Sequence, residues 1–250
     1  MKQISISIIC LFILGSCISS GTGDRKVYLE KRILDADVHF SDDEIEIYNY
    51  LIDVTLSNNQ KRTIVTGDTT ALNEKIMTGE LKNADDVRKY LETLESISIK
   101  TDKIILHNAT TIVGLSKEKT YKDNMELSKA GFQKKYGNMY DDLFDEFIAV
   151  NEFDYSLENH INTRDDILEY NNVENQIDET NGATDFWGKL YETIPDVCGI
   201  MRLSKIGFIS NKAIVDVQFL RGSMNGFVDY IIFEKEDNWR VVDSFRHIYY

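Results

Sequence analysis

The sequence predicts an α+β fold in which helices pack on a mainly antiparallel β-sheet, a meander formed by the C-terminal part of the chain. Two observations predict this class. After Gly199, segments typical of β-strands follow one another with only short turns between them, and short turns require neighbouring strands to run antiparallel. Earlier in the chain, apolar residues recur mostly at helical spacing, and polar stretches separate those segments.

A first helix is predicted to begin after Ser41. This serine suits the N-cap position, acidic residues fill the following turn, and apolar residues recur at helical spacing (Ile45, Ile47, Tyr48, Leu51 and Ile52). The β-branched content of residues 61–68 is typical of a buried strand, which Gly67 ends. A second helix is predicted over residues 83–97.

The middle of the chain is less regular. Residues 104–113 are apolar and consistent with either a strand or a turn, whereas residues 123–150 are typical of helix with a break near Gly131 or Gly137. Residues 151–184 are rich in Asn, Asp and Glu. They predict a long polar loop with some helix, and the alternative is a linker between two domains.

The last third gives the clearest pattern. Residues 185–193 predict an amphipathic helix that ends at Pro195 and covers one face of the sheet. The predicted strands follow at residues 200–204, 207–209, 213–220, 227–235 and 239–249. Residues 213–220 alternate between two sets of side chains, which predicts one packed face and one wetter face.

The N-terminus predicts an export signal rather than part of the fold. Lys2 precedes an apolar run over residues 4–14, which is too short to span a bilayer. The junction Leu14-Gly15-Ser16-Cys17 resembles the lipobox of bacterial lipoproteins, in which the cysteine becomes the lipidated first residue. We therefore expect a signal peptide over residues 1–16, a lipid on Cys17, and a flexible tether over residues 17–24. An ordinary secretory signal is the alternative.

Residues 25–250 are then expected to form a single α+β domain. Cys10 lies in the predicted signal and Cys17 would carry the lipid, so Cys198 is left unpaired and a disulfide framework is excluded. The expected location is the cell envelope, with the lipid in a bacterial membrane at the outer membrane or the periplasmic face.

The net charge of −14 excludes nucleic acid as an expected ligand, because the chain would repel a phosphate backbone. Electrostatics favours a basic protein or peptide as partner. Solubility alone also explains an acidic surface.

The C-terminal third resembles a group of uncharacterised lipoproteins of the Bacteroidota. The shared pattern is an aromatic helix, a proline, a glycine, a Gly-Phe strand and a final Trp strand. Here these elements are Phe186-Trp187-Gly188-Lys189-Leu190-Tyr191, Pro195, Gly199, Leu203-Ser204, Gly207-Phe208-Ile209 and Asn238-Trp239-Arg240-Val241-Val242. Those relatives often carry a cysteine pair near residues 222–226, which this chain lacks, and the resemblance implies no activity.

A weaker resemblance links the final strands to NTF2-like domains. In those cone-shaped α+β folds the concave sheet face holds a ligand pocket, in some cases with a catalytic Asp and His. The resemblance therefore implies a small-ligand-binding domain or a hydrolase as an alternative.

The histidines and the serine near the C-terminus give no catalytic pattern. His39, His107, His160 and His247 lack the spacing of zinc ligands. Strand alternation sends Ser244 and His247 to opposite faces, which argues against a serine nucleophile.

The acidic residues admit two interpretations. Asp141 with Asp145, and Asp142 with Glu146, lie one helical turn apart and would hold a cation or share a proton if buried. A solvated acidic face explains them at less cost. Residues 178–182 resemble part of a calcium loop but lack its closing ligands.

Three further groups have a structural explanation beside a functional one. Asp68-Thr69-Thr70 would line a pocket mouth or cap a helix. The aromatic residues Trp187, Tyr191 and Trp239 would form a ligand platform or belong to the core. Gly222 and Gly226 fit a hairpin turn better than a phosphate-binding loop.

No catalytic residue, metal or cofactor is predicted. The expected function is therefore a membrane-anchored, non-enzymatic binding or interaction module of the cell envelope. An NTF2-like enzyme or ligand-binding domain is one alternative, and an immunity or inhibitor protein for a basic partner is another.

Overall fold

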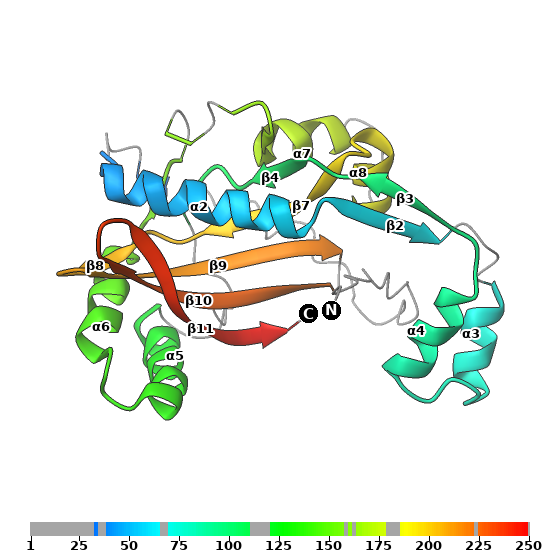
Figure 1. Ribbon diagram of the computed structural model, residues 1–250, viewed down its shortest axis with the longest axis horizontal. Coiled ribbons are helices and arrows are strands. Elements are labelled where there is room, and N and C mark those ends of the chain that lie inside the picture. The colour runs from blue at the N-terminus through cyan, green and yellow to red at the C-terminus, as the bar shows by residue number, and fades with distance from the viewer. Residues whose placement is uncertain are drawn as a thin grey trace.

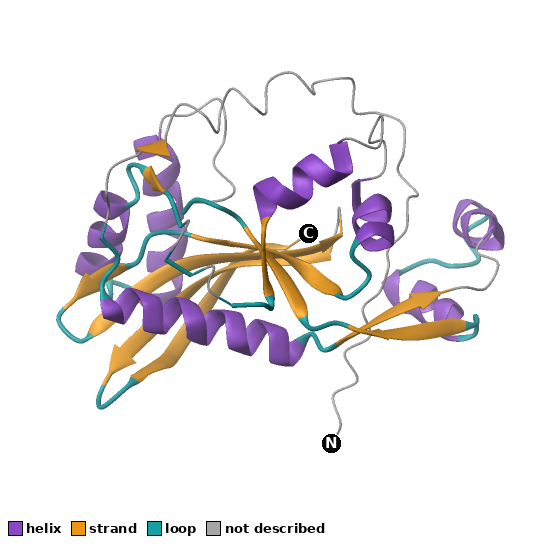
Figure 2. Ribbon diagram, turned by 90° about the horizontal axis from the view of Figure 1, so that it is seen from above, coloured by secondary structure: helices purple, strands orange, loops and turns teal. Residues whose placement is uncertain are grey.

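A computed structural model describes residues 33–34, 39–65, 70–110, 121–157, 160–161, 164–178, 186–222 and 225–249 of the chain (Figure 1). It confirms the α+β class, with helices packed around a central sheet (Figure 2). The predicted signal peptide, Cys17 and the tether lie outside the described residues. Within the described part of the chain, no helix combines the length and the apolar character needed to cross a membrane.

The main sheet has seven strands in the order β11-β10-β9-β7-β4-β6, and β8 pairs with β9. The strands are β4 (Lys103–Leu106), β6 (Ile167–Glu169), β7 (Val197–Leu203), β8 (Gly207–Ile209), β9 (Lys212–Gly222), β10 (Asn225–Lys235) and β11 (Trp239–Tyr249). The C-terminal strands pair antiparallel, which confirms the predicted meander. Strands β4 and β6 extend the sheet in parallel, so the sheet as a whole is mixed.

Strand β7 begins at Val197, three residues before the predicted start. Pro195 ends the preceding helix, and the chain then enters the sheet at once. Gly199 is needed there, because a Cβ atom at this position would lie 2.4 Å from the carbonyl oxygen of Leu220. Gly226 has a similar reason, since its Cβ would lie 2.5 Å from the carbonyl oxygen of Phe219. Close packing of neighbouring strands therefore explains both glycines.

Helix α2 (Asp42–Asn58) covers one face of the sheet (Figure 1). Its inward residues, among them Tyr48 and Leu51, share a buried cluster with Val215 and Val217 of β9. Ile214, which precedes Val215, belongs to a different cluster, which confirms the alternation predicted for this strand. Both faces are packed rather than one being wetter, because residues 213–219 are all buried.

Helices α5 (Tyr121–Tyr136) and α6 (Asp141–Val150) cover the opposite face beside Ile214. Aromatic side chains dominate this contact, and the ring of Phe132 lies 4.7 Å from that of Phe144. The helix break falls at Gly137, whose φ of 58° suits glycine, whereas Gly131 stays inside α5.

Helices α7 (Tyr170–Asp178) and α8 (Phe186–Thr193) pack on the same face, over β4 and β7. The predicted polar loop over residues 151–184 therefore contains β6 and α7, together with β5 (Asp154–Tyr155), which pairs in parallel with β1 (Ile33–Leu34). Trp187 and Tyr191 belong to α8 and pack against the cluster that α8 shares with α7, whereas Trp239 belongs to the cluster under α2. The three aromatic residues thus form no common platform and act as core.

Strands β2 (Lys61–Val65) and β3 (Ser96–Lys100) form a separate two-stranded ribbon that carries α3 (Thr70–Met77) and α4 (Ala84–Glu92). This arm projects from the body, with α3 and α4 at its far end (Figures 1 and 2). The strand predicted within residues 61–68 is present as β2, which ends at Val65, and its residue Arg62 is buried whereas Lys61 is exposed. The β-branched residues favour the extended backbone of this strand. The helix predicted over residues 83–97 ends at Glu92, before β3 begins.

The buried loop between β7 and β8 connects α2, α6 and the sheet. The Lys205 ammonium lies 2.7 Å from the carboxylate of Glu44 in α2, and both side chains are largely buried. The Asn151 side chain at the end of α6 bonds both the amide and the carbonyl of Lys205. Tyr48 donates to the carbonyl of Ser204 at 2.9 Å.

Replacing Lys205→Met is expected to lower the free energy of unfolding by about 3 kcal/mol, because it leaves the Glu44 carboxylate buried without its cation. Urea denaturation followed by circular dichroism measures this change. Lys212→Met is the matched control, since Lys212 pairs with Glu234 at the surface and its loss should cost below about 1 kcal/mol. Equal effects of the two substitutions would contradict the structural role of the Glu44 pair.

Candidate binding site

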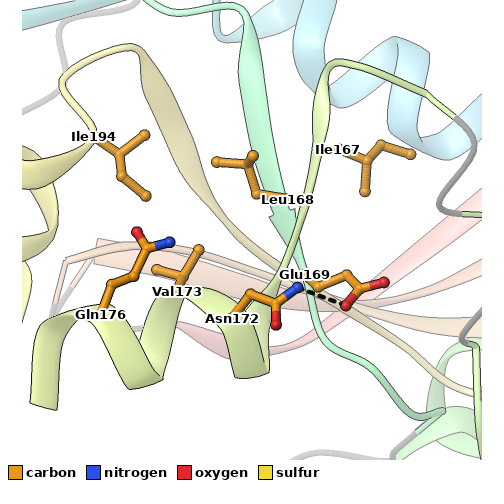
Figure 3. Close-up of a pocket in the computed structure, with 7 residues that line it drawn as sticks. All are labelled: Ile167, Leu168, Glu169, Asn172, Val173, Gln176 and Ile194. Carbon is orange, nitrogen blue, oxygen red and sulfur yellow. Dashed lines mark hydrogen bonds between the residues drawn. The ribbon is translucent and has the colours of Figure 1, made fainter.

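A hollow of about 340 Å³ opens at the β6 edge of the sheet. It lies between β6, α7 and the residue that follows α8 (Figure 3). Its apolar wall is formed by Ile167, Leu168, Val173 and Ile194, and its polar groups are Glu169, Asn172 and Gln176. The hollow therefore combines an apolar surface with one carboxylate and two amides.

The local sequence explains why these side chains meet. Strand β6 runs directly into α7, so Glu169 at the end of the strand lies beside the first helical turn. The Asn172 amide donates to the Glu169 carboxylate at 2.8 Å, and the Asn171 backbone amide donates to the side chain of Asn108 at 2.9 Å. These bonds fix the start of α7. Val173 and Gln176 then rise from α7 on the side that faces Leu168 (Figure 3).

The hollow belongs to the most acidic part of the chain. Residues 141–178 contain 12 Asp and Glu residues against the single base Arg164, so this stretch accounts for −11 of the net charge of −14. Arg164 is engaged by two carboxylates, at 2.6 Å from Asp53 and 2.7 Å from Asp166, and these bonds raise the pKa of Arg164. Four of the 12 acids lie on α6, away from α7 (Figure 1), and the acids next to the lining residues, among them Asp165, Asp166 and Glu174, attract cations toward the hollow at long range.

The acidic pairs predicted on α6 do not form a cation site. Lys129 of α5 lies 2.5 Å from the Asp145 carboxylate, and Gln133 donates to Asp141 at 2.8 Å. Asp142 is exposed. Across the described residues, no group of three or more His, Cys, Asp or Glu side chains is arranged to hold a metal ion. The solvated acidic face is the interpretation that fits these contacts.

The histidines do not converge on the hollow. His107, at the end of β4, is only 5% exposed, and burial and the charge of Arg202 lower its pKa to about 4. His39 and His160 are exposed. The side chain of His247, Asp68-Thr69 and residues 179–182 of the predicted calcium-like loop lie outside what the structure describes. Thr70 begins α3.

Cys198 is a buried free thiol, and burial raises its pKa to about 12. At neutral pH the thiol is therefore protonated and poorly nucleophilic.

Sequence reasoning singled out none of the residues that line the hollow. Residues 167–176 mix apolar side chains with Asn and Gln without a clear period, so they were expected to form a loop. The signal that was available is charge, because counting acids along the chain isolates residues 141–178. That count finds the region but not the hollow, which requires Ile194 from a distant segment.

No family model, no curated protein and no solved structure matches the chain. The site is therefore interpreted from its own chemistry.

The burial of His107 predicts acid sensitivity. The unfolded chain takes up a proton at this residue near pH 6.5, whereas the folded protein does so only near pH 4. The stabilisation is therefore complete above pH 6.5 and is lost as the pH falls toward 4, by about 2–3 kcal/mol. In urea titrations across this range, His107→Gln should show a flatter dependence of unfolding free energy on pH. His160→Gln, at an exposed position, should follow the wild type. An unchanged slope in His107→Gln would count against this assignment.

Proposed function

We propose that this protein is a non-enzymatic binding module of the bacterial cell envelope, anchored through a lipid on Cys17, and that it binds a basic protein or peptide. The observation that carries the proposal is the hollow at the β6 edge within the acidic stretch of residues 141–178. An immunity or inhibitor role is the narrower form of this proposal, in which the basic partner is a single toxin or enzyme.

The chemistry of the hollow suits a lysine or arginine side chain. The aliphatic stem of such a side chain would pack against Leu168, Val173 and Ile194. Its cationic end would reach the Glu169 carboxylate and the amide oxygens of the neighbouring Asn172 and Gln176. The volume is at the small end of the range for ligand pockets, which fits one side chain rather than a large ligand.

Long-range electrostatics supports the same partner. The net charge of residues 141–178 would speed the approach of a basic protein, and the acids next to the hollow, such as Asp165, Asp166 and Glu174, would orient it toward the hollow. The effect requires low to moderate ionic strength, because exposed charges are screened over about 10 Å at 0.1 M salt.

The hydrolase alternative is less well supported by the same residues. Glu169 is the single titratable group among those that line the hollow. The buried His107 and Asp216 of the sheet, 5% and 1% exposed, are not among its lining residues, although the ring of His107 lies 5.3 Å from that of Tyr170, which follows Glu169. A catalytic site needs convergent acid–base groups that a substrate can reach. The accessible groups of the hollow instead suit recognition of a cation.

Glu169→Gln is expected to weaken the binding of an acetylated oligolysine peptide by about 3- to 10-fold, because it removes the charge but keeps the shape of the side chain. Fluorescence anisotropy of the labelled peptide measures the affinity. Glu92→Gln is the control, since Glu92 is exposed on α4 of the arm, far from the hollow. Equal affinities of wild type and Glu169→Gln would exclude the hollow as the binding site.

Cys17→Ser is expected to abolish incorporation of a labelled fatty acid and to move the protein from the membrane fraction to the soluble fraction of a bacterial host. Metabolic labelling followed by fractionation measures both effects. Cys198→Ser, at the buried free thiol, should leave the labelling unchanged. Continued labelling of Cys17→Ser would show that lipid is not attached at this residue.

A further inference from the structure

Two arginines contact Tyr191 where the arm joins the body, and neither has an acidic partner among the residues that the structure describes. Arg62 of β2 is 5% exposed. Its guanidinium lies 3.5 Å from the ring centroid of Tyr191 in α8, and its Nη2 donates to the carbonyl of Pro195 at 3.0 Å. Its Nε and Nη1 are buried and donate to no acceptor within the described ranges of the chain. The guanidinium is therefore only partly satisfied.

Arg221 at the end of β9 belongs to the same cluster. The Tyr191 hydroxyl donates to the carbonyl of Arg221 at 2.8 Å, so one tyrosine contacts both residues. Burial lowers the pKa of each arginine, and the positive charge of Arg221 lowers the pKa of Arg62 further. Through the described part of the chain, no Asp or Glu carboxylate lies within ion-pairing distance of either guanidinium.

This arrangement is unusual for so acidic a chain. The protein has 42 acidic residues against 28 basic ones, so a shortage of carboxylates does not explain why these two arginines pair with none of the described acids. A buried cation without a partner opposes folding, and the stacking on Tyr191 offsets only part of that cost. Buried donors in native proteins normally have an acceptor, from the protein or from a bound species.

We propose that Arg62 and Arg221 bind a small oxyanion, of the phosphate or carboxylate class, at the junction between the arm and the body. Guanidinium groups match both classes because two parallel N–H groups bond two oxygens. Arg221 remains partly exposed, which gives a small anion a route from solvent, whereas the burial of Arg62 excludes a bulky one. Arg62, Tyr191 and Arg221 are not among the residues that line the hollow, and the ligand has the opposite charge.

The anion would also influence the arm. Arg62 belongs to the ribbon that carries α3 and α4, whereas Tyr191, Pro195 and Arg221 belong to the body. A ligand held by both arginines therefore links the ribbon to the body. Binding should stabilise the folded protein and at the same time hold the arm against the body, because the ligand binds the assembled junction and not the unfolded chain.

Thermal unfolding of the full chain tests the proposal. Sodium phosphate and sodium acetate are each compared with sodium chloride at equal ionic strength and pH. We expect phosphate, acetate or both to raise the Tm of the wild type by several degrees relative to chloride, and the salt that does so identifies the class of anion. Arg221→Met should remove the shift, and Arg88→Met, at a surface arginine of α4, should retain it.

Arg221→Lys tests the geometry in a variant that keeps the charge. It should reduce the shift, because an ammonium does not bond two oxygens in parallel. In chloride alone, Arg221→Met should raise the Tm above that of the wild type, since the buried Arg62 then no longer shares the cluster with a second positive charge. The proposal is overturned if neither phosphate nor acetate stabilises the wild type, or if Arg221→Met responds to them as the wild type does.

Discussion

The buried contact between Glu44 and Lys205 determines how the layers of this protein fit together. Glu44 accepts hydrogen bonds from Ser41 and so completes the capping box that starts α2. The same carboxylate binds Lys205, whose backbone is bonded on both sides by Asn151 of α6. The start of one helix and the end of another are thus fixed to one loop of the sheet, on opposite faces. Packing of apolar side chains then fills the space that these polar contacts define.

This layering decides where binding chemistry can lie. Helix α2 covers one face of the sheet, and the pairs α5–α6 and α7–α8 cover the other. Polar side chains on the sheet, such as His107, Asp216 and Gln218, are consequently buried. They contribute to the structure and to its dependence on pH rather than to contact with a partner. Accessible polar groups converge instead at the edge strand β6, and at the base of the arm the buried Arg62 lies beside the partly exposed Arg221.

The sequence predicted the parts of the fold that depend on local interactions. Alternation and short turns identified β8 to β11, and the capping serine located α2, because each signal lies within a few residues of the element it specifies. Strand β4 was left open between a strand and a turn, and β6 was not identified, since their parallel pairing joins segments that are far apart in the sequence. The hollow and the arginine pair were missed for the same reason. Ile194 follows α8 but completes a hollow formed by β6 and α7, and Arg62 bonds Pro195, which lies more than a hundred positions away in the sequence.

The distribution of charge distinguishes the two sites in physical terms. Within residues 141–178, the acidic side chains at the surface need no partner, because water solvates them at little cost. Their excess is therefore compatible with a protein that is folded before a basic ligand binds. The arm, residues 61–100, carries 7 acidic and 7 basic residues, so it contributes no net charge to the electrostatic field of the molecule. Arg62 differs because its guanidinium is removed from water. A buried charge has to be compensated within the folded structure, so the junction depends on an anion for stability while the edge of the sheet does not depend on its cation. An anion at the junction therefore affects the stability of the folded protein, whereas a cation in the hollow reports which partner the folded protein binds.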